Sequence, residues 1–280
     1  MVNLANQTKD EMQTAIVTGA AGGLGKAVVR SLLAKDFHVI ALDINVTGLD
    51  DLAGTQNLEI HPFDITNHTR VKQLPSEFNF EEKGLDALIC LAGAYGIFPV
   101  TENDPEAFSN IMSVNFHANV SLVNAMLKPL IIKQGRVVII SSESHKIQAM
   151  FQPYMISKAA LEAYARTAWQ ELALKGVWLS IIRPGAIDTP LLNWMYEDES
   201  GNEASVYSKE FSASLKQSKK MVGRKTTPEK VAAKVIHAAT SRWPKRVYRV
   251  NNNPVLTLIT LLPPRIIDRM IVRQFRQKTK

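Results

Sequence analysis

Short apolar runs alternate with longer segments of mixed polarity along most of this 280-residue chain. Several runs are apolar at consecutive positions, as expected for strands that helices cover on both faces of a parallel sheet. Regular alternation of such strands with helices predicts an α/β domain built on a doubly wound parallel sheet. We expect strands at residues 14–18, 38–42, 58–63, 85–92, 136–141 and 177–183, and helices near residues 24–35, 66–74, 104–133, 153–174 and 228–240.

The alternation weakens after Pro190, where the polar stretch YEDESGNEAS predicts an exposed insertion. The helix at 228–240 resumes the pattern and carries ordinary start signals, with Thr227 as its N-cap and Pro228 at its first position. The pattern divides the chain into a polar tail at residues 1–12, one domain at 13–253 and a C-terminal extension at 254–280.

Composition and charge exclude several functional classes. Cys90 is the only cysteine, which excludes an intrachain disulfide and a cysteine-rich zinc site, and no histidine pair has metal-ligand spacing. The N-terminal residues lack a secretory signal, and no apolar run approaches the roughly 18 residues that span a bilayer. Residues 242–280 hold ten Lys or Arg and one acid, whereas the whole chain carries +7. These observations lead us to expect a cytoplasmic protein without a metal site. We expect no nucleic-acid partner, because the basic charge is confined to the C-terminal end.

A glycine-rich turn follows the first expected strand in the sequence TAIVT-GAAGGLG, and a helix is expected directly after it. Free N–H groups and the positive end of the helix dipole make such a turn an anion site. The literal G-x-G-x-x-G motif is absent because Val28 occupies its third glycine position. A P-loop is excluded because Ala20 replaces its first glycine and Ala27 replaces its magnesium-binding hydroxyl residue. We predict pyrophosphate contacts from Thr18, Gly19, Gly23, Leu24 and Gly25.

Asp43 ends the second expected strand, 18 residues after Gly25. A carboxylate at this position accepts hydrogen bonds from an adenosine ribose and repels a 2′-phosphate. Gly22 supplies no cation that would attract such a phosphate. These residues favour NAD over NADP, although a surface aspartate at a strand end is also common.

Tyr154 and Lys158 lie four positions apart in the helix expected at 153–174, so their side chains share one helix face. A tyrosine with a pKa of about 10 transfers protons poorly at neutral pH, and a neighbouring cation favours its phenolate form. The pair also arises by chance on helix surfaces, so its meaning depends on the motifs around it.

Taken together, these motifs resemble those of the classical short-chain dehydrogenases/reductases, over about residues 12–190 and more loosely to about 250. Further pieces match in order: Asp64 ends HPFD, Asn115 lies in SVNFHAN, Ser142 ends GRVVIISS, and Thr189 ends RPGAIDT. The resemblance implies a single Rossmann-type domain that dimerises through its two long helices. It implies catalytic roles for Asn115, Ser142, Tyr154 and Lys158, and further cofactor contacts from Asp64, Ile65, Ala92, Gly93, Tyr154, Lys158, Pro184, Gly185, Ile187 and Thr189.

The implied reaction is NAD(H)-dependent interconversion of an alcohol and a carbonyl by hydride transfer. Tyr154 is expected to be the general acid/base, while Lys158 stabilises its phenolate and holds the nicotinamide ribose. Ser142 would position the substrate oxygen, and Asn115 would link Lys158 to solvent through a water molecule. A non-catalytic module that binds or senses NAD(H) is the alternative.

The sequence departs from the family pattern at two places. Residues 90–93 read Cys-Leu-Ala-Gly where the family has N-N-A-G, so the asparagine that stiffens this loop is missing. The interval from Ser142 to Tyr154 is one residue shorter than the family implies, which keeps Ser141 as an alternative for the catalytic serine. His145 is close enough in sequence to touch substrate, but a solvated loop histidine is the simpler interpretation.

Apolar residues cluster before the catalytic helix and in the 190–227 segment, where the resemblance places the substrate lid. They favour a lipophilic substrate and a likeness to the steroid- and retinol-dehydrogenase-like branch. Packing of about half of them on the core is the alternative. The residues are Met150, Phe151, Leu191, Leu192, Trp194, Met195, Tyr207 and Phe211.

After Pro263-Pro264 the extension has the pattern of a basic amphipathic helix. Such a helix lies in a membrane interface, caps its own domain or packs on a partner subunit, and the sequence leaves these three open. Its expected apolar face is Ile266, Ile267, Met270, Ile271 and Phe275, and its basic face is Arg265, Arg269, Arg273 and Arg276.

Overall fold

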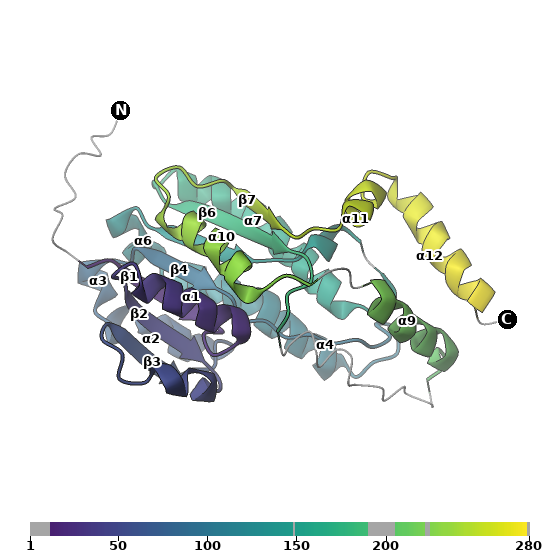
Figure 1. Cartoon of the computed structure of the whole chain (residues 1–280), viewed down its shortest axis with the longest axis horizontal. Helices are drawn as coiled ribbons and strands as arrows, with labels where there is room; N and C mark the ends of the chain where they lie inside the picture. The colour runs from purple at the N-terminus through teal and green to yellow at the C-terminus, as the bar shows by residue number, and fades with distance from the viewer. Residues whose placement is uncertain (1–11, 148, 190–204, 222–224, 279–280) are drawn as a thin grey trace.

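The computed structural model describes residues 12–147, 149–189, 205–221 and 225–278, and it is built on one seven-stranded sheet (Figure 1). All strand pairs are parallel, in the order β3-β2-β1-β4-β5-β6-β7. The predicted doubly wound parallel sheet is confirmed, and the six expected strands lie close to their expected bounds. The strands are β1 Thr14–Thr18, β2 His38–Asp43, β3 Leu58–Pro62, β4 Ala87–Cys90, β5 Arg136–Ile140, β6 Trp178–Pro184 and β7 Val247–Val250.

The edge strand β7 was absent from the sequence prediction. Its four residues, VYRV, pair with β6, but only Tyr248 is buried. A strand of four residues with only one buried side chain, interrupted by the exposed Arg249, lacks the continuous apolar run that identifies the inner strands.

Helices cover both faces of the sheet and enclose one apolar core on each face. On one face lie α1 Gly23–Leu33 and α10 Pro228–Thr240; on the other lie α2 His68–Glu77, α5 Ala118–Ala125 and α7 Pro153–Ala173. The short elements between them are the 3₁₀ turns Val46–Leu52 and Glu143–Lys146, and the helices α3 Phe80–Lys83 and α6 Leu127–Lys133.

Alternation along β1 shows how one strand serves both cores. Ala15 and Val17 face α1 and α10, whereas Ile16 packs into the core under α2, α5 and α7. All three side chains are fully buried. This two-sided burial explains why the strand reads as a continuous apolar run rather than as an alternating pattern.

The helix predicted over residues 104–133 is interrupted. It consists of α4 Pro105–Met112, a π-helical turn at Ser113–His117, and then α5 and α6. The π turn contains Asn115, whose side chain bonds to Ala94 and Ser157 instead of facing solvent. A π turn inserts an extra residue into the helical ladder, and this insertion aims Asn115 at the loop after β4.

The C-terminal part adds three further helices at one end of the molecule: α9 Ser208–Met221, α11 Pro254–Ile259 and α12 Pro264–Lys278 (Figure 1). Helix α12 contacts α9. Within the described residues, no helix combines the length and apolarity needed to cross a membrane. The polar stretch expected as an exposed insertion, and most of the expected N-terminal tail, lie outside the described residues.

The strand order reverses at the β1–β4 boundary, because the chain moves outward to β2 and β3 on one side and to β4 on the other. Crevices at the carboxyl ends of strands on either side of such a switch point are the usual ligand sites of open α/β sheets. The glycine-rich turn after β1 and the loop after β4 both emerge there.

A largely buried ion pair attaches α7, the helix that carries Tyr154 and Lys158, to the sheet. Arg183 on β6 donates from Nε to Glu162 Oε1 at 2.8 Å and from Nη2 to Oε2 at 2.7 Å. The side chains are only 9% (Glu162) and 16% (Arg183) exposed. Burial raises the pKa of Glu162, but the hydrogen bonds and charge of Arg183 outweigh it, so the pKa lies below its ordinary value.

Replacing Glu162 by Ala is expected to lower the free energy of unfolding by about 3 kcal/mol at neutral pH, because Arg183 then stays buried without its partner. Urea unfolding measures this change. Because the folded-state pKa of Glu162 is depressed, its contribution is fully present above the ordinary value of 4.5 and is lost as pH falls through the folded-state value.

The matched control is Asp51→Ala, which removes an exposed carboxylate that pairs with both Lys26 and Arg30. Solvent screens exposed ion pairs and they add little stability, so the free energy of unfolding of this variant is expected to stay close to that of the parent protein. Equal losses for Glu162→Ala and Asp51→Ala would contradict the assignment.

Candidate active site

The turn between β1 and α1 is closed tightly by two glycines. Gly19 has a φ of +67°, and a Cβ at this position would lie 2.6 Å from the backbone N of Ala92. A Cβ on Gly25 would lie 2.0 Å from the carbonyl oxygen of Gly19. Both positions therefore require glycine. The start of α1 at Gly23 has no side-chain cap, so its first N–H groups face the cavity that Gly19, Gly22 and Gly23 line.

Asp43 lies beside this turn at the end of β2. Its Oδ2 accepts a hydrogen bond from Ala21 N at 2.9 Å, and its Oδ1 accepts one from Asn45 N at 3.2 Å. The carboxylate thus holds the glycine turn against β2 and also lines the cavity. Its neighbour Asp64, after β3, accepts hydrogen bonds from the backbone and hydroxyl of Thr66 and lines the same cavity.

The loop after β4 is fixed despite the loss of the family asparagine at residues 90–93. Asn115 Oδ1 accepts from Ala94 N, and its Nδ2 donates to Ala94 O, both at 2.8 Å. Thr18 also reaches this loop, since its Oγ1 accepts from Ala92 N at 3.5 Å. Gly93 lies between these anchors, with its hypothetical Cβ 3.4 Å from Asn115 Oδ1. Two side chains from other elements therefore supply the rigidity that the loop sequence itself lacks.

Tyr154 and Lys158 lie together in the first turns of α7. The Lys158 Nζ is 5.6 Å from the centre of the Tyr154 ring and donates to the carbonyl of Ile140 at 3.0 Å. The pKa of Tyr154 is raised to about 12, because the effect of burial exceeds the lowering effect of a hydrogen bond with Ser142. Burial lowers the pKa of Lys158 to about 8, and the negative charge of Glu162 opposes this shift. Lys158 is thus buried and Tyr154 is partly buried, both along the cavity, so the pair is not a coincidence on the outer surface of a helix.

The structure separates the two candidate serines. Ser142 lines the cavity and forms the hydrogen bond with Tyr154, and its Oγ lies 2.8 Å from Ser144 Oγ. Ser141 also borders the cavity, but it is buried and its hydroxyl lies on the side of Glu162 instead of Tyr154. The short connection to Tyr154 contains a 3₁₀ turn after Ser142 and a left-handed Phe151 with a φ of 64°. These compact features bring Ser142 to the tyrosine across the shortened interval.

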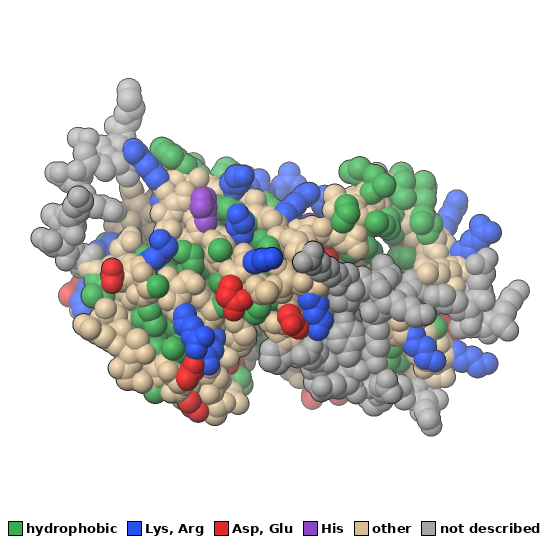
Figure 2. All heavy atoms as spheres, viewed as in Figure 1, with side chains coloured by type: hydrophobic (Ala, Val, Ile, Leu, Met, Phe, Trp, Pro, Cys, Tyr) green, Lys and Arg blue, Asp and Glu red, His purple; other side chains and the backbone are tan. Residues whose placement is uncertain are grey.

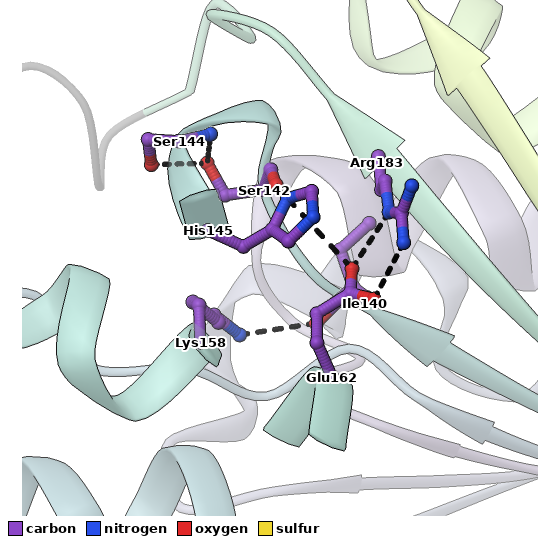
Figure 3. Close-up of polar contacts among 7 residues, drawn as sticks. All are labelled: Ile140, Ser142, Ser144, His145, Lys158, Glu162 and Arg183. Carbon is purple, nitrogen blue, oxygen red and sulfur yellow. Dashed lines mark hydrogen bonds and ion pairs between the residues drawn. The ribbon is translucent and has the colours of Figure 1, made fainter. Parts of the chain in front are cut away.

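His145 neither faces substrate nor sits in solvent, so the expectation of a solvated histidine was wrong. Its Nδ1 is 2.9 Å from the carbonyl oxygen of Ser142 and 4.0 Å from Glu162 Oε1 (Figure 3). Burial lowers the pKa of His145, although Glu162 opposes this. Figure 3 shows Ser142, His145, Glu162 and Arg183 as one polar network, and Lys158 lies on the same helix as Glu162.

A cavity of about 710 Å³ joins these parts. It is lined by every predicted catalytic or cofactor residue except Thr18 and Asn115, which lie behind its wall and hold the β4 loop. The predicted residues that line it are Gly19, Gly23, Leu24, Gly25, Asp43, Asp64, Ile65, Ala92, Gly93, Ser142, Tyr154, Lys158, Pro184, Gly185, Ile187 and Thr189.

Tyr95 is a site residue that the sequence analysis missed. Its ring centre is 4.9 Å from that of Tyr154, and its hydroxyl donates to Gln152 Oε1 at 2.9 Å. Both Tyr95 and Gln152 line the cavity. The position of Tyr95, just past the carboxyl end of β4, was the available signal.

The residues expected to line a lipophilic pocket divide into three groups. Met150 lines the cavity, whereas Phe151 packs against Tyr207 and Phe211 at ring distances of 5.8 and 5.6 Å. The three aromatic residues support the cavity wall without lining it, as the packing alternative anticipated. The remaining expected residues, Leu191, Leu192, Trp194 and Met195, lie outside the described residues.

The residues present fit a nicotinamide dinucleotide. The glycine turn, in which a Cβ on Gly19 or Gly25 would clash with backbone atoms, leaves backbone N–H groups open to a pyrophosphate at a helix start. Asp43 keeps acceptor capacity for ribose hydroxyls, and Tyr154, Lys158 and Ser142 lie along the same cavity. The arrangement can hold a dinucleotide and move a proton beside it.

Comparisons with known proteins agree with this geometry. Retinol dehydrogenase 5 of Mus musculus is 29% identical over 275 residues, which cover 91% of this chain and 86% of the relative. NADPH-dependent 3-dehydrocapnine reductase of Ornithobacterium rhinotracheale is 28% identical over 289 residues, covering 96% and 99%.

Solved structures share the fold. A short-chain dehydrogenase from Streptomyces avermitilis superposes with a TM-score of 0.77 at 22% identity, covering 97% of this chain and all of that one. The structure of 4-hydroxyisoleucine dehydrogenase complexed with NADH gives a TM-score of 0.71 at 24% identity, covering 86% and 97%. A protein-family model described as short chain dehydrogenase matches residues 13–200. This chain therefore belongs to the short-chain dehydrogenase family of oxidoreductases.

Proposed function

We propose that this protein is an NAD(H)-dependent oxidoreductase that interconverts an apolar alcohol and its carbonyl by hydride transfer. The observation that carries the proposal is the placement of Ser142, Tyr154 and Lys158 on one wall of the cavity that the glycine turn also lines. A bound nicotinamide dinucleotide supplies the hydride acceptor for oxidation and the hydride donor for reduction.

Tyr154 is proposed to exchange the hydroxyl proton of the substrate. With its pKa raised to about 12 by burial, the phenol is protonated at neutral pH and ready to donate to a carbonyl. Oxidation requires the phenolate, which the charge of Lys158 and the hydrogen bond with Ser142 favour. Oxidation should therefore accelerate as pH rises toward about 8, above which Lys158 loses the charge that favours the phenolate. Reduction should slow at higher pH, where the phenol itself is lost.

The remaining residues are proposed to position the reactants. Ser142 aligns the substrate oxygen with the Tyr154 hydroxyl, and Lys158 holds the nicotinamide ribose. The side chain of Asn115 is engaged with Ala94 and Ser157, so we assign it the task of holding the β4 loop. Its expected part in a water relay to Lys158 stays a prediction.

The charges near the glycine turn support NAD rather than NADP. Among the described residues that line the cavity, Lys158 is the only Lys or Arg, whereas Asp43 stands beside the turn. The nearby cations Lys26 and Arg30 are both paired with Asp51. A 2′-phosphate at this place would meet a carboxylate without a compensating cation.

The lining supports a lipophilic substrate. Beyond the catalytic residues the cavity is walled by apolar side chains, among them Ile147, Met150 and Met155. Hydrophobic walls with a few placed polar groups are typical of sites for apolar small molecules. The likeness to retinol dehydrogenase 5 supports the same substrate class.

Replacing Tyr154 by Phe is expected to lower kcat by roughly 10²–10⁴-fold and to leave NAD binding intact, because only the acid/base group is removed. Assays of NADH formation with secondary alcohols, sterols and retinoids measure kcat. Fluorescence titration with NADH measures cofactor binding. If the parent protein binds NAD but turns over nothing on the panel, a binding or sensing module becomes the better reading.

Replacing Ser142 by Ala is expected to reduce kcat/KM by about tenfold or more, since it removes one hydrogen bond that aligns the reacting oxygen. Ser141→Ala is the matched control and should change kcat/KM by less than about threefold, because this hydroxyl points toward Glu162. The opposite ranking of the two variants would reassign the catalytic serine.

Replacing Asp43 by Ala is expected to narrow the preference for NAD over NADP by at least about tenfold, since a repulsive charge near the 2′-phosphate is removed. The ratio of kcat/KM for the two cofactors measures the effect. Loss of the bond to Ala21 also perturbs the turn, so Asp43→Asn, which keeps an acceptor without the charge, separates the two causes. An unchanged ratio in both variants would remove Asp43 from the ribose site.

A further inference from the structure

The two C-terminal helices form a cover over the open side of the cavity. We call residues 254–276, which contain α11 and most of α12, the C-terminal cover. Leu256 and Ile259 from α11, together with Ile267, Ile271 and Phe275 from α12, line the cavity. Phe275 is buried against this wall. The inner face of the predicted amphipathic helix is therefore already used by the domain itself.

The outer side of the cover is also apolar. Among the described residues, fifteen large hydrophobic side chains are exposed, and seven of them belong to this short segment. Figure 2 shows hydrophobic side chains gathered over the region of α11 and the start of α12, with basic side chains beside them. The seven are Val255, Leu258, Leu261, Leu262, Ile266, Met270 and Val272.

The sequence analysis assigned Ile266 and Met270 to the same apolar face as Ile267. In the structure Ile266 and Met270 are about half exposed, and Met270 lies at the border between the cavity and solvent. One helix thus carries two apolar surfaces: an inner one that closes the cavity and an outer one without a described protein neighbour. Contiguous exposed apolar patches of this kind mark sites for a protein or a membrane.

The charge around the outer patch distinguishes these occupants. Arg265, Arg269, Arg273 and Arg276 are all exposed on α12, where Asp268 is the only acidic residue. If a second copy of the chain packed face to face on this patch, two-fold symmetry would bring the arginines of both copies together. Anionic lipid headgroups complement both the arginines and the apolar side chains.

We propose that the outer face of the C-terminal cover docks on an anionic membrane surface, and that apolar substrate enters the cavity from that membrane. The docking step stands on the exposed patch and its arginines alone. The entry step rests on the proposed function, because it assumes a lipophilic substrate. The position of the cover fits substrate entry, because helices α11 and α12 form part of the cavity wall and also carry the exposed apolar side chains.

The cover is also joined to the catalytic loop. Glu143, which follows Ser142, accepts a hydrogen bond through Oε2 from the backbone N of Asn253 at 2.6 Å. Asn253 caps α11, with its Oδ1 accepting from Val255 N at 2.9 Å. A shift of α11 on docking would therefore reach the loop that holds Ser142. The cover and the chemical site behave as one connected unit.

Co-sedimentation with vesicles tests the docking step with the full chain. Binding is expected to vesicles of phosphatidylcholine with phosphatidylserine, to weaken as salt rises, and to be much weaker with phosphatidylcholine alone. Arg269→Glu with Arg273→Glu should weaken binding by at least about 25-fold, taking about fivefold for each lost arginine. Lys35→Glu with Lys128→Glu, the same charge change on distant exposed lysines, controls for total charge.

The apolar part is tested by Leu258→Asp with Leu261→Asp, whose side chains are 66% and 76% exposed and do not line the cavity. Leu174→Asp, at an 84% exposed leucine after α7, is its control. A fluorescent label that responds to polarity gives the geometry, because Cys90 is buried and an introduced cysteine is labelled selectively. A label at Leu261→Cys should shift to the blue with anionic vesicles, and one at Leu174→Cys should not.

Three results would overturn the docking step. These are equal vesicle binding by the cover variants and their controls, a blue shift at both labelled positions, or no binding by the parent protein. If the parent fails to bind and sedimentation velocity shows a dimer that Leu258→Asp with Leu261→Asp dissociates, a second copy occupies the face.

The entry step has its own readout. The Leu258→Asp, Leu261→Asp variant should raise KM at least about fivefold for an alcohol presented in vesicles and leave KM for a water-soluble alcohol unchanged. Equal KM values for the vesicle substrate would refute entry from the membrane. Vesicle binding without turnover of either alcohol would refute the proposed function and leave docking established.

Discussion

The buried positive charge of Lys158 is the constraint on which the site depends. An unpaired ammonium inside a protein costs several kcal/mol, and burial already lowers the pKa of Lys158 to about 8. The protonated form of Lys158 is stabilised by its hydrogen bond to the Ile140 carbonyl at the end of β5. The negative charge of Glu162, one turn further along α7, stabilises it as well. Glu162 is in turn held by Arg183 on β6. The effect that we propose for Lys158 on Tyr154 therefore depends on three elements of the fold.

Contacts from other elements also hold the loop after β4, which lacks the asparagine of the family pattern. Asn115 holds this loop through two hydrogen bonds to the backbone of Ala94. Its side chain reaches the loop from a π-helical turn. Thr18 adds a long contact to Ala92 from the glycine-turn side. The cofactor cradle, the β4 loop and the base of α7 therefore share hydrogen bonds, and disturbing one of them is felt by the others.

The sequence predicted the inner strands and the main helices on both faces of the sheet, and nearly all of the site residues that it predicted line the cavity. These signals are local: a two-sided apolar strand, a glycine that a tight turn requires, and a tyrosine–lysine pair one helical turn apart. The edge strand β7 and the break at Ser113–His117 were missed. Strand β7 owes its pairing to β6, and the π turn owes its bonds to Ala94 and Ser157, so neither leaves a periodic pattern in its own segment.

By itself, the sequence determined the family and the glycine turn, and it predicted the tyrosine–lysine pair that we propose for proton transfer, because each follows from residue types at short fixed spacings. Only the tertiary structure separated Ser142 from Ser141, buried His145 against Glu162, and brought Tyr95 onto the Tyr154 ring. It also divided the C-terminal helix into an inner face on the cavity and an outer face in solvent. These outcomes depend on which elements meet in space, and contacts between distant segments have no spacing that the chain can display.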